Sequence, residues 1–206
     1  MTLPRPLVGD VLARLSIERP APTDLAALRR VYAAWCDGVP FDNVRKMIAL
    51  GSGAGGPLPG GDAAEFFTGW LADGASGTCW ATSGALHALL VALRFDARRV
   101  IGSIRDRDVL NHGTAVARVD GTDWVTDTSL MTCEPLPLGD GVHLHRHPLT
   151  PAEVERNARG HVLWFDVRTH AESFPCRLLV DPAPSELCGV RVEASRTESV
   201  FNDALF

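Results

Sequence analysis

Apolar positions near the start of the chain recur every three to four residues, the spacing that places them on one face of a helix. The segment from Val8 to Leu15 fits a short amphipathic helix. A second helix is predicted from about Asp24 to Cys36, with Thr23 as its N-cap. Pro40 ends this pattern, because a proline disfavours helical backbone at the residue before it. The first part of the chain is therefore predicted to be helical.

A glycine-rich stretch at residues 51–61 interrupts the helical pattern. It lacks the residue order of a phosphate-binding loop, and we interpret it as a flexible loop rather than a lid over a cleft. Asp62 is expected to cap a further helix that runs to about Leu71. A short loop then leads into the apolar segment Ala81 to Leu93, which is also predicted to be helical.

The hydrophobic period changes from that of a helix to that of a strand after Arg94. Arg98 to Ile104 and Gly113 to Val119 each fit a strand. Asp120-Gly121 is a hairpin signal, so Thr122 to Asp127 is expected to run back antiparallel to the strand before it.

The last part of the chain predicts two more strands, at His161 to Thr169 and Pro175 to Val180. Thr150-Pro151-Ala152-Glu153 is predicted to begin a short helix, with threonine at the N-cap and proline in the first turn. The order of elements indicates the α+β class. We expect a helical lobe over residues 1–95 and an antiparallel sheet or barrel over residues 96–206.

Composition narrows the range of functions. The chain has 206 residues, of which 46% are apolar and 22% charged, which is ordinary for a globular protein. A net charge of -5 and a pI near 5.8 give no electrostatic reason to expect nucleic acid or an anionic membrane. No apolar run approaches the roughly 18 residues of a membrane helix, and the first residues lack a signal-peptide pattern.

The five cysteines are odd in number and scattered, with no Cys-x-x-Cys pair. This pattern suits free thiols in a reducing compartment, so we expect a soluble cytoplasmic protein. Four of the five have no neighbouring histidine or metal-ligand spacing and are interpreted as core thiols: Cys36, Cys133, Cys176 and Cys188.

Cys79 is different, because it lies where a glycine-containing loop meets a predicted helix start. The positive end of the helix dipole and the unpaired amides there favour thiolate over thiol. His112 and Asp127 follow on successive strands, which gives a nucleophile, a base and an orienting carboxylate in chain order. Each residue alone would be better explained as structural. Asp123 is the rival carboxylate, but its place beside the hairpin turn predicts that it is solvated.

Four segments in chain order carry a family resemblance. Residues 39–44, Val-Pro-Phe-Asp-Asn-Val, look like the motif Ile-Pro-Phe-Glu-Asn-Leu, and residues 77–80 with the following leucine-rich helix look like Arg-Gly-Gly-Tyr-Cys-Phe-Glu. His112 with residues 125–127 is the third match, and residues 195–201 are a weaker fourth. The family is the arylamine N-acetyltransferases, within the transglutaminase-like and papain-like thiol enzymes. The resemblance runs over nearly the whole chain.

The resemblance implies a fold and a reaction. It implies that the helical lobe carries Cys79, that the β lobe carries His112 and Asp127, and that the three have a papain-like arrangement. It also implies ping-pong transfer of an acyl group through the cysteine to a small-molecule amine or hydroxyl acceptor. The donor would be an acyl-CoA or acyl carrier protein thioester acting as co-substrate, and no cofactor would be bound.

Four residues are candidates for substrate binding. The resemblance places Phe41 near the active-site cleft, although a packing role fits it at least as well. Thr78 and Trp80 flank the candidate nucleophile, and Gly113 directly follows the candidate base. For Trp80, lining an acyl pocket and filling the core are equally good interpretations.

The chain departs from the family pattern near these motifs. Ala75 stands where the family has arginine, Ser76 replaces a glycine, Ala81 replaces a glutamate, and Thr128 begins Thr-Ser-Leu in place of Val-Gly-Phe-Gly. The family's C-terminal third domain also has no counterpart in this chain. We therefore expect a specialised, biosynthetic acyl transfer, in which an acyl carrier protein or a second subunit completes the cleft.

Two other functions stay open on the same residues. With water as acceptor, the triad would make a cysteine hydrolase or amidase of the transglutaminase-like group. A degenerate family member would instead act as a non-catalytic partner subunit. His143, His145 and His147 alternate and would suit zinc on one face of a strand. The surrounding glycines and Pro148 indicate an exposed loop or edge, so we expect no metal site.

Overall fold

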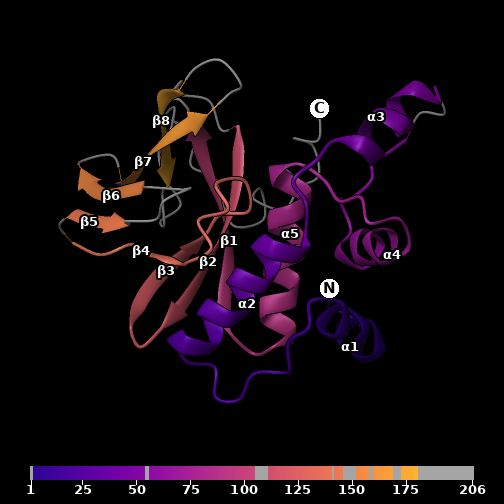
Figure 1. Ribbon diagram of the computed structural model, residues 1–206, viewed down its shortest axis with the longest axis horizontal. Helices are drawn as coiled ribbons and strands as arrows, with labels where there is room; N and C mark the ends of the chain where they lie inside the picture. The colour runs from indigo at the N-terminus through magenta and orange to yellow at the C-terminus, as the bar shows by residue number, and fades with distance from the viewer. Residues whose placement is uncertain are drawn as a thin grey trace.

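The computed structural model describes the backbone of residues 2–53, 56–104, 111–140, 142–145, 152–157, 160–168 and 173–180, and side chains within 2–53, 56–102, 111–140 and 142–144. Within these residues, five helices precede eight strands. The helices are α1 (Arg5–Arg14), α2 (Leu25–Gly38), α3 (Val44–Gly51), α4 (Ala63–Asp73) and α5 (Cys79–Ala92). The strands are β1 (Asp96–Ile104), β2 (His112–Val119), β3 (Thr122–Thr126), β4 (Leu136–Pro137), β5 (Val142–His145), β6 (Ala152–Asn157), β7 (Gly160–Arg168) and β8 (Ser173–Val180). Figure 1 shows the helices on one side of β1 and β2, and β5 to β8 on the other. The expected α+β class is confirmed.

The described strands form one antiparallel sheet in the order β4-β3-β2-β1-β8-β7-β6-β5. Asp120 and Gly121, with φ of 50° and 79°, make the predicted turn between β2 and β3. On β1, Gly102 pairs with His112 on one side and with Val180 on the other. His112 therefore pairs with β1 at the point where β1 also begins to pair with β8, in a strand that lies between β1 and β3 in the sheet order.

The predicted N-cap of α2 is wrong by one residue. The cap is Asp24, whose carboxylate accepts a hydrogen bond of 2.7 Å from the Ala27 amide. Thr23 and Asp24 are both good capping residues, so composition alone did not decide between them. Asp62 caps α4 as predicted, through a 2.9 Å bond from the Glu65 amide.

Helix α3 was not predicted. It begins at Val44, the last residue of the motif at 39–44, and its large apolar side chains are exposed. Arg45 attaches it to α4 through an ion pair with Glu65, and the Arg45 guanidinium lies where a side chain at Gly69 would be. Val44, Met47 and Ile48 have the spacing of one helix face, but the segment is only eight residues long. The signal was therefore present in the sequence and was missed.

The predicted helix at residues 150–153 is also wrong. Ala152 and Glu153 begin strand β6, and the two residues before them lie outside the described part of the chain. β6 pairs with β7 from Ala152 opposite Phe165 to Asn157 opposite Gly160, and with β5 on its other side. This pairing with two strands outweighs a local capping signal, as tertiary context commonly does.

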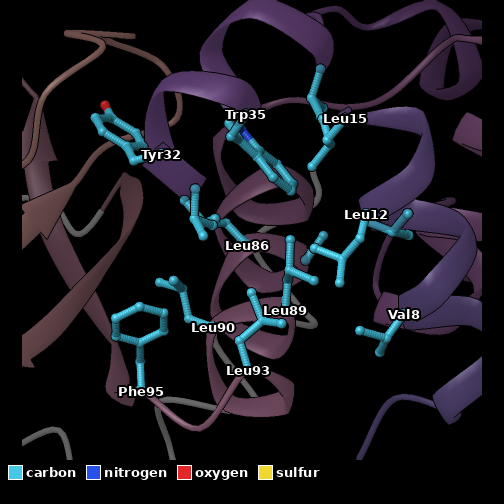
Figure 2. Close-up of a cluster of buried hydrophobic side chains, with 14 of the residues drawn as sticks. Val8, Leu12, Leu15, Tyr32, Trp35, Leu86, Leu89, Leu90, Leu93 and Phe95 are labelled. Carbon is cyan, nitrogen blue, oxygen red and sulfur yellow. The ribbon is translucent and has the colours of Figure 1, made fainter. Parts of the chain in front are cut away.

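One buried hydrophobic cluster joins the helices to the sheet (Figure 2). Leu86, Leu89 and Leu90 of α5 are fully buried in it, together with Trp35 of α2. Each fully buried leucine contributes roughly 1.5–3 kcal/mol to folding. The cluster also includes Ala117 of β2, so residues before and after position 95 share one core. Such packing fixes α5 rigidly against β1 and β2, and with it the position of its first residue.

Among the described helices, none has both the length and the apolar character needed to cross a membrane.

Candidate active site

Cys79 is the first residue of α5, at the end of a loop tied to the segment after α2. Phe41 and Gly77 form an isolated parallel β-bridge, and the Asp42 amide donates to the Gly77 carbonyl at 3.2 Å. The Asp42 carboxylate accepts bonds from the Ser76 amide at 2.9 Å and the Val44 amide at 3.0 Å. Asp42 thus holds the loop before the cysteine through backbone groups.

The first turn of α5 is closely packed. A Cβ built on Gly77 would lie 2.7 Å from the Ala81 Cβ, and one built on Gly60 would lie 2.6 Å from it. Side-chain carbons do not approach so closely without a shift. Ala81 is buried between these two glycines, which leaves no space for the glutamate that the family pattern has at this position.

His112 and Asp127 meet across the β2–β3 hairpin. His112 begins β2, Asp127 directly follows β3, and their side chains are 1% and 2% exposed. The His112 Nε2 lies 2.6 Å from the Asp127 Oδ2. The other carboxylate oxygen accepts 2.9 Å bonds from the Ser129 and Leu130 amides. The carboxylate is therefore fixed on both oxygens, so it can hold the imidazole in one orientation.

The Asp127 segment is also held from the helical side. The Tyr32 hydroxyl of α2 donates a 2.5 Å hydrogen bond to the Asp127 carbonyl, and it lies 3.2 Å from the Thr132 hydroxyl. Burial raises the pKa of Tyr32 well above its ordinary value, so the phenol stays protonated and able to donate.

The pKa shifts of His112 and Asp127 favour an ion pair. Burial is the largest influence on the pKa of His112 and lowers it, but the charge and hydrogen bond of Asp127 and then those of Cys79 together raise it to about 10. Burial is likewise the largest influence on the pKa of Asp127 and raises it. The charge and hydrogen bond of His112, with the two backbone amides, lower that pKa below its ordinary 3.8. At neutral pH the favoured state is imidazolium beside carboxylate.

Cys79 lies against the same imidazole. A hydrogen bond with the thiol is among the causes that raise the pKa of His112. Since Nε2 is bonded to Asp127, Nδ1 is the ring nitrogen left for the thiol. Cys79 is half-buried, whereas His112 and Asp127 are buried. The structure therefore brings the three predicted residues together, and the cysteine is the one open to solvent.

The candidate substrate-binding residues lie in different environments. Phe41 is 43% exposed beside the nucleophile loop, and Thr78 is half-buried at the N-cap of α5. Trp80 and Gly113 are buried. Their contact with a substrate stays a prediction.

Other side chains with reactive or metal-binding groups lie apart from this site. The rival carboxylate of Asp123 is bonded to Arg98 at 2.7 and 3.2 Å, away from the imidazole. In the described part of the chain, no group of three or more metal-ligating side chains occurs. His143 lies exposed on β5, while the side chains of His145 and His147 lie outside the described residues.

The structure describes the side chains of two of the four cysteines that the sequence analysis interprets as core thiols. Cys36 is buried and Cys133 is half-buried, and both are free. Burial, the largest influence, raises the pKa of Cys36 to about 12, so it is a poor nucleophile at neutral pH. The side chains of Cys176 and Cys188 lie outside the described residues.

Some residues that support the site were missed from the sequence. Tyr32 lies in the predicted helix from Asp24 to Cys36 and Asp42 in the motif at residues 39–44, but neither segment indicates a bond to the site. Thr82, Ser83 and Thr128 make buried hydrogen bonds near the triad, and no signal in the sequence linked residues so far apart in the chain. The departure at Thr128 from the family pattern was the one available sign.

No protein-family model matches the sequence, and no curated protein is similar to it in sequence. Solved structures do match. The arylamine N-acetyltransferase from Salmonella typhimurium matches with a TM-score of 0.71 and 16% identity, over 97% of this chain and 69% of that chain. The one from Mycobacterium smegmatis matches with a TM-score of 0.70 and 22% identity, over 95% of this chain and 69% of that chain. One from Bacillus cereus, described as having a Cys-His-Glu catalytic triad, matches with a TM-score of 0.70 and 14% identity, over 96% of this chain and 74% of that chain.

The chain thus has the arylamine N-acetyltransferase fold, as its sequence motifs indicated. At these identities the similarity establishes the fold, while the activity must be argued from the site.

Proposed function

We propose that this protein is a thiol-dependent acyltransferase that works through an acyl-Cys79 intermediate. One observation carries the proposal: a half-buried cysteine at a helix N-terminus lies against His112, whose other nitrogen is 2.6 Å from the buried Asp127 carboxylate. Nucleophilic catalysis by a triad requires a nucleophile next to a base, and an orienting group hydrogen-bonded to that base. The fold supports the same reaction class.

In the first half-reaction, the Cys79 thiolate attacks the carbonyl carbon of a thioester donor. The bond from that carbon to the donor sulfur breaks, and the donor thiol leaves with the proton of the His112 imidazolium. An acyl-cysteine and a neutral histidine result. The oxyanion formed during attack would be stabilised by amides in the first turn of α5, which have no acceptor within the helix.

In the second half-reaction, an amine or hydroxyl attacks the acyl-cysteine. His112 accepts the proton of the attacking group, and Cys79 leaves as thiolate, which restores the starting ion pair. Asp127 holds the imidazole in one tautomer and stabilises the imidazolium through its charge. His112 therefore holds the proton in the resting ion pair, gives it to the donor thiol and regains it from the acceptor.

The donor is proposed to be an acyl-CoA or an acyl carrier protein thioester, and the acceptor a small amine of a biosynthetic pathway. Phe41 offers an exposed aromatic ring beside the nucleophile loop, where it would contact the substrate together with Thr78. Trp80 and Gly113 would shape the buried wall behind them. The free state of the described cysteines supports a reducing, cytoplasmic location.

Intact-protein mass spectrometry tests the proposal. The protein would be incubated with acetyl-CoA, longer acyl-CoA thioesters and acyl carrier protein thioesters, beside Cys79→Ala and Asp123→Asn. An increase in mass by one acyl group, present in Asp123→Asn and absent in Cys79→Ala, is expected, and the donor that produces it names the donor class. No adduct and no donor consumption would refute the proposal. Donor consumption without an adduct or an acceptor would identify a hydrolase instead.

A further inference from the structure

Three buried hydroxyls form a hydrogen-bonded cluster between α5 and the segment after β3. The hydroxyl cluster consists of Thr82, Ser83 and Thr128, each 1% exposed or less. The Thr128 oxygen lies 2.7 Å from that of Thr82 and 3.0 Å from that of Ser83. The Ser83 hydroxyl also donates to the Gly113 carbonyl at 2.8 Å.

Each end of this cluster is attached to a member of the candidate triad. The two α5 hydroxyls lie one helical turn after Cys79, on the same rigid helix. Thr128 directly follows Asp127, and the carbonyl that accepts from the cluster belongs to the residue directly after His112. The cluster therefore joins, at one point, the three separate segments that carry the nucleophile, the base and the carboxylate.

The number of available protons limits the directions of these hydrogen bonds. Ser83 must donate to the Gly113 carbonyl, because a carbonyl oxygen only accepts. The Thr82 hydroxyl can donate to the Thr78 carbonyl at 3.0 Å or to Thr128. In either case the Thr128 hydroxyl has a proton to donate to one of its two neighbours, Thr82 or Ser83, and it contacts both. Thr128 is thus the middle member, and removing its hydroxyl breaks the connection on both sides.

A role in filling space alone does not explain the cluster. Valine has nearly the shape of threonine and avoids the cost of burying a hydroxyl, which is roughly 1–3 kcal/mol when no partner is present. Three adjacent hydroxyls are justified in a core when their hydrogen bonds, made only at short distances and suitable angles, specify one arrangement of the parts they join.

We propose that the hydroxyl cluster sets the position of the His112–Asp127 pair relative to Cys79, with Thr128 as the positioning residue. The inference rests on the proposed function only in taking Cys79 as the nucleophile. Thr128 acts through its neighbour: a shift of its backbone moves the Asp127 carboxylate and, through the 2.6 Å bond, the imidazole. A displacement of about 1 Å at a reacting group lowers the rate by about a hundredfold.

The test compares Thr128→Val, Thr128→Ser and a matched control, Thr126→Val. Thr126 is equally buried, and its hydroxyl donates to the Ala115 carbonyl at 3.1 Å, a bond within the β2–β3 hairpin that does not reach α5. The rate of alkylation at Cys79 by iodoacetamide would be measured from pH 5 to 9, with peptide mapping to separate Cys79 from other thiols. Thermal unfolding would be measured in parallel.

We expect Thr128→Val to slow Cys79 alkylation at neutral pH by about tenfold and to change its pH profile. Thr128→Ser, which retains the hydroxyl, should stay within about twofold of the native rate. Thr126→Val should lower the melting temperature without changing the alkylation profile. Native alkylation in Thr128→Val, or an equal loss in Thr126→Val, would overturn the inference. Should Thr128→Val fail to fold, Ser83→Ala is measured against the same criteria.

The readout needs no acyl donor, so the inference and the proposed function can fail separately. If the native protein never loads an acyl group and the contrast between Thr128→Val and Thr126→Val persists, the acyltransferase is refuted and the positioning role stands. If acyl loading occurs and Thr128→Val and Thr126→Val behave alike, the positioning role is refuted and the acyltransferase stands.

Discussion

Replacing Asp127 by asparagine should reverse the way stability depends on pH. In the native protein the pKa of His112 is raised from 6.5 to about 10, mainly through the charge of Asp127 acting against burial. This rise corresponds to about 5 kcal/mol in favour of the imidazolium in the folded state. Asparagine has the same shape without the charge, so burial then dominates and the pKa of His112 falls below 6.5.

The sign follows from which state binds the proton more tightly. A histidine with a raised folded pKa stabilises the protein fully below pH 6.5, and this stability is lost as pH rises towards about 10. The contribution falls by about 1.4 kcal/mol per pH unit within that window. In Asp127→Asn the folded pKa is depressed, so the contribution of His112 is full above pH 6.5 and is lost as pH falls below it.

The assay is urea unfolding from pH 5 to 9, with both proteins in a Cys79→Ala background, so that only His112 and residue 127 of the triad are compared. The Cys79→Ala change removes one influence that raises the pKa of His112, but Asp127 raises this pKa more than Cys79 does. We expect the unfolding free energy of Asp127→Asn, relative to its parent, to increase steadily with pH. A difference that is constant with pH would refute the ion pair.

Three further predictions follow from the contacts around the site. Gly77→Ala should lower the unfolding free energy by about 1–3 kcal/mol in urea titration, because its Cβ would meet that of Ala81 at 2.7 Å. Gly77→Ala should also slow Cys79 alkylation, because the first turn of α5 must shift. A Cβ at Gly74 meets no atom, but this residue has φ of 76°, so Gly74→Ala should lower the unfolding free energy through backbone strain and leave Cys79 alkylation unchanged. Tyr32→Phe should cost about 1 kcal/mol and slow Cys79 alkylation, because the Asp127 carbonyl loses its buried donor; unchanged alkylation would contradict this role.

The parts of the fold that the sequence predicts are those with local signals. Asp62 caps α4 because its carboxylate reaches an amide three residues on, and Asp120-Gly121 turns between β2 and β3 because both residues tolerate positive φ. The helix start at Cys79 is visible as a loop meeting an apolar segment. These features needed no knowledge of residues distant in the chain.

The failures have the opposite character. The segment from Ala152 is a strand because two neighbouring strands pair with it, which outweighs the helix-starting signal before it. Helix α3 has apolar residues at helical spacing, but it is short, its apolar face is exposed, and the Arg45–Glu65 ion pair attaches it to α4. Both depend on partners that lie elsewhere in the chain.

The candidate site combines these two kinds of information. The order of Cys79, His112 and Asp127 in the chain predicted that they meet, because their elements could be placed and the family motifs gave the order. The sequence could not predict what holds them at the right separation, since Thr128 bonds to residues 45 and 46 positions away. A hydrogen bond of that kind exists only after α5 has packed on the sheet. Reactive residues can therefore be read from a chain before the residues that position them, and the latter are where a structure adds most.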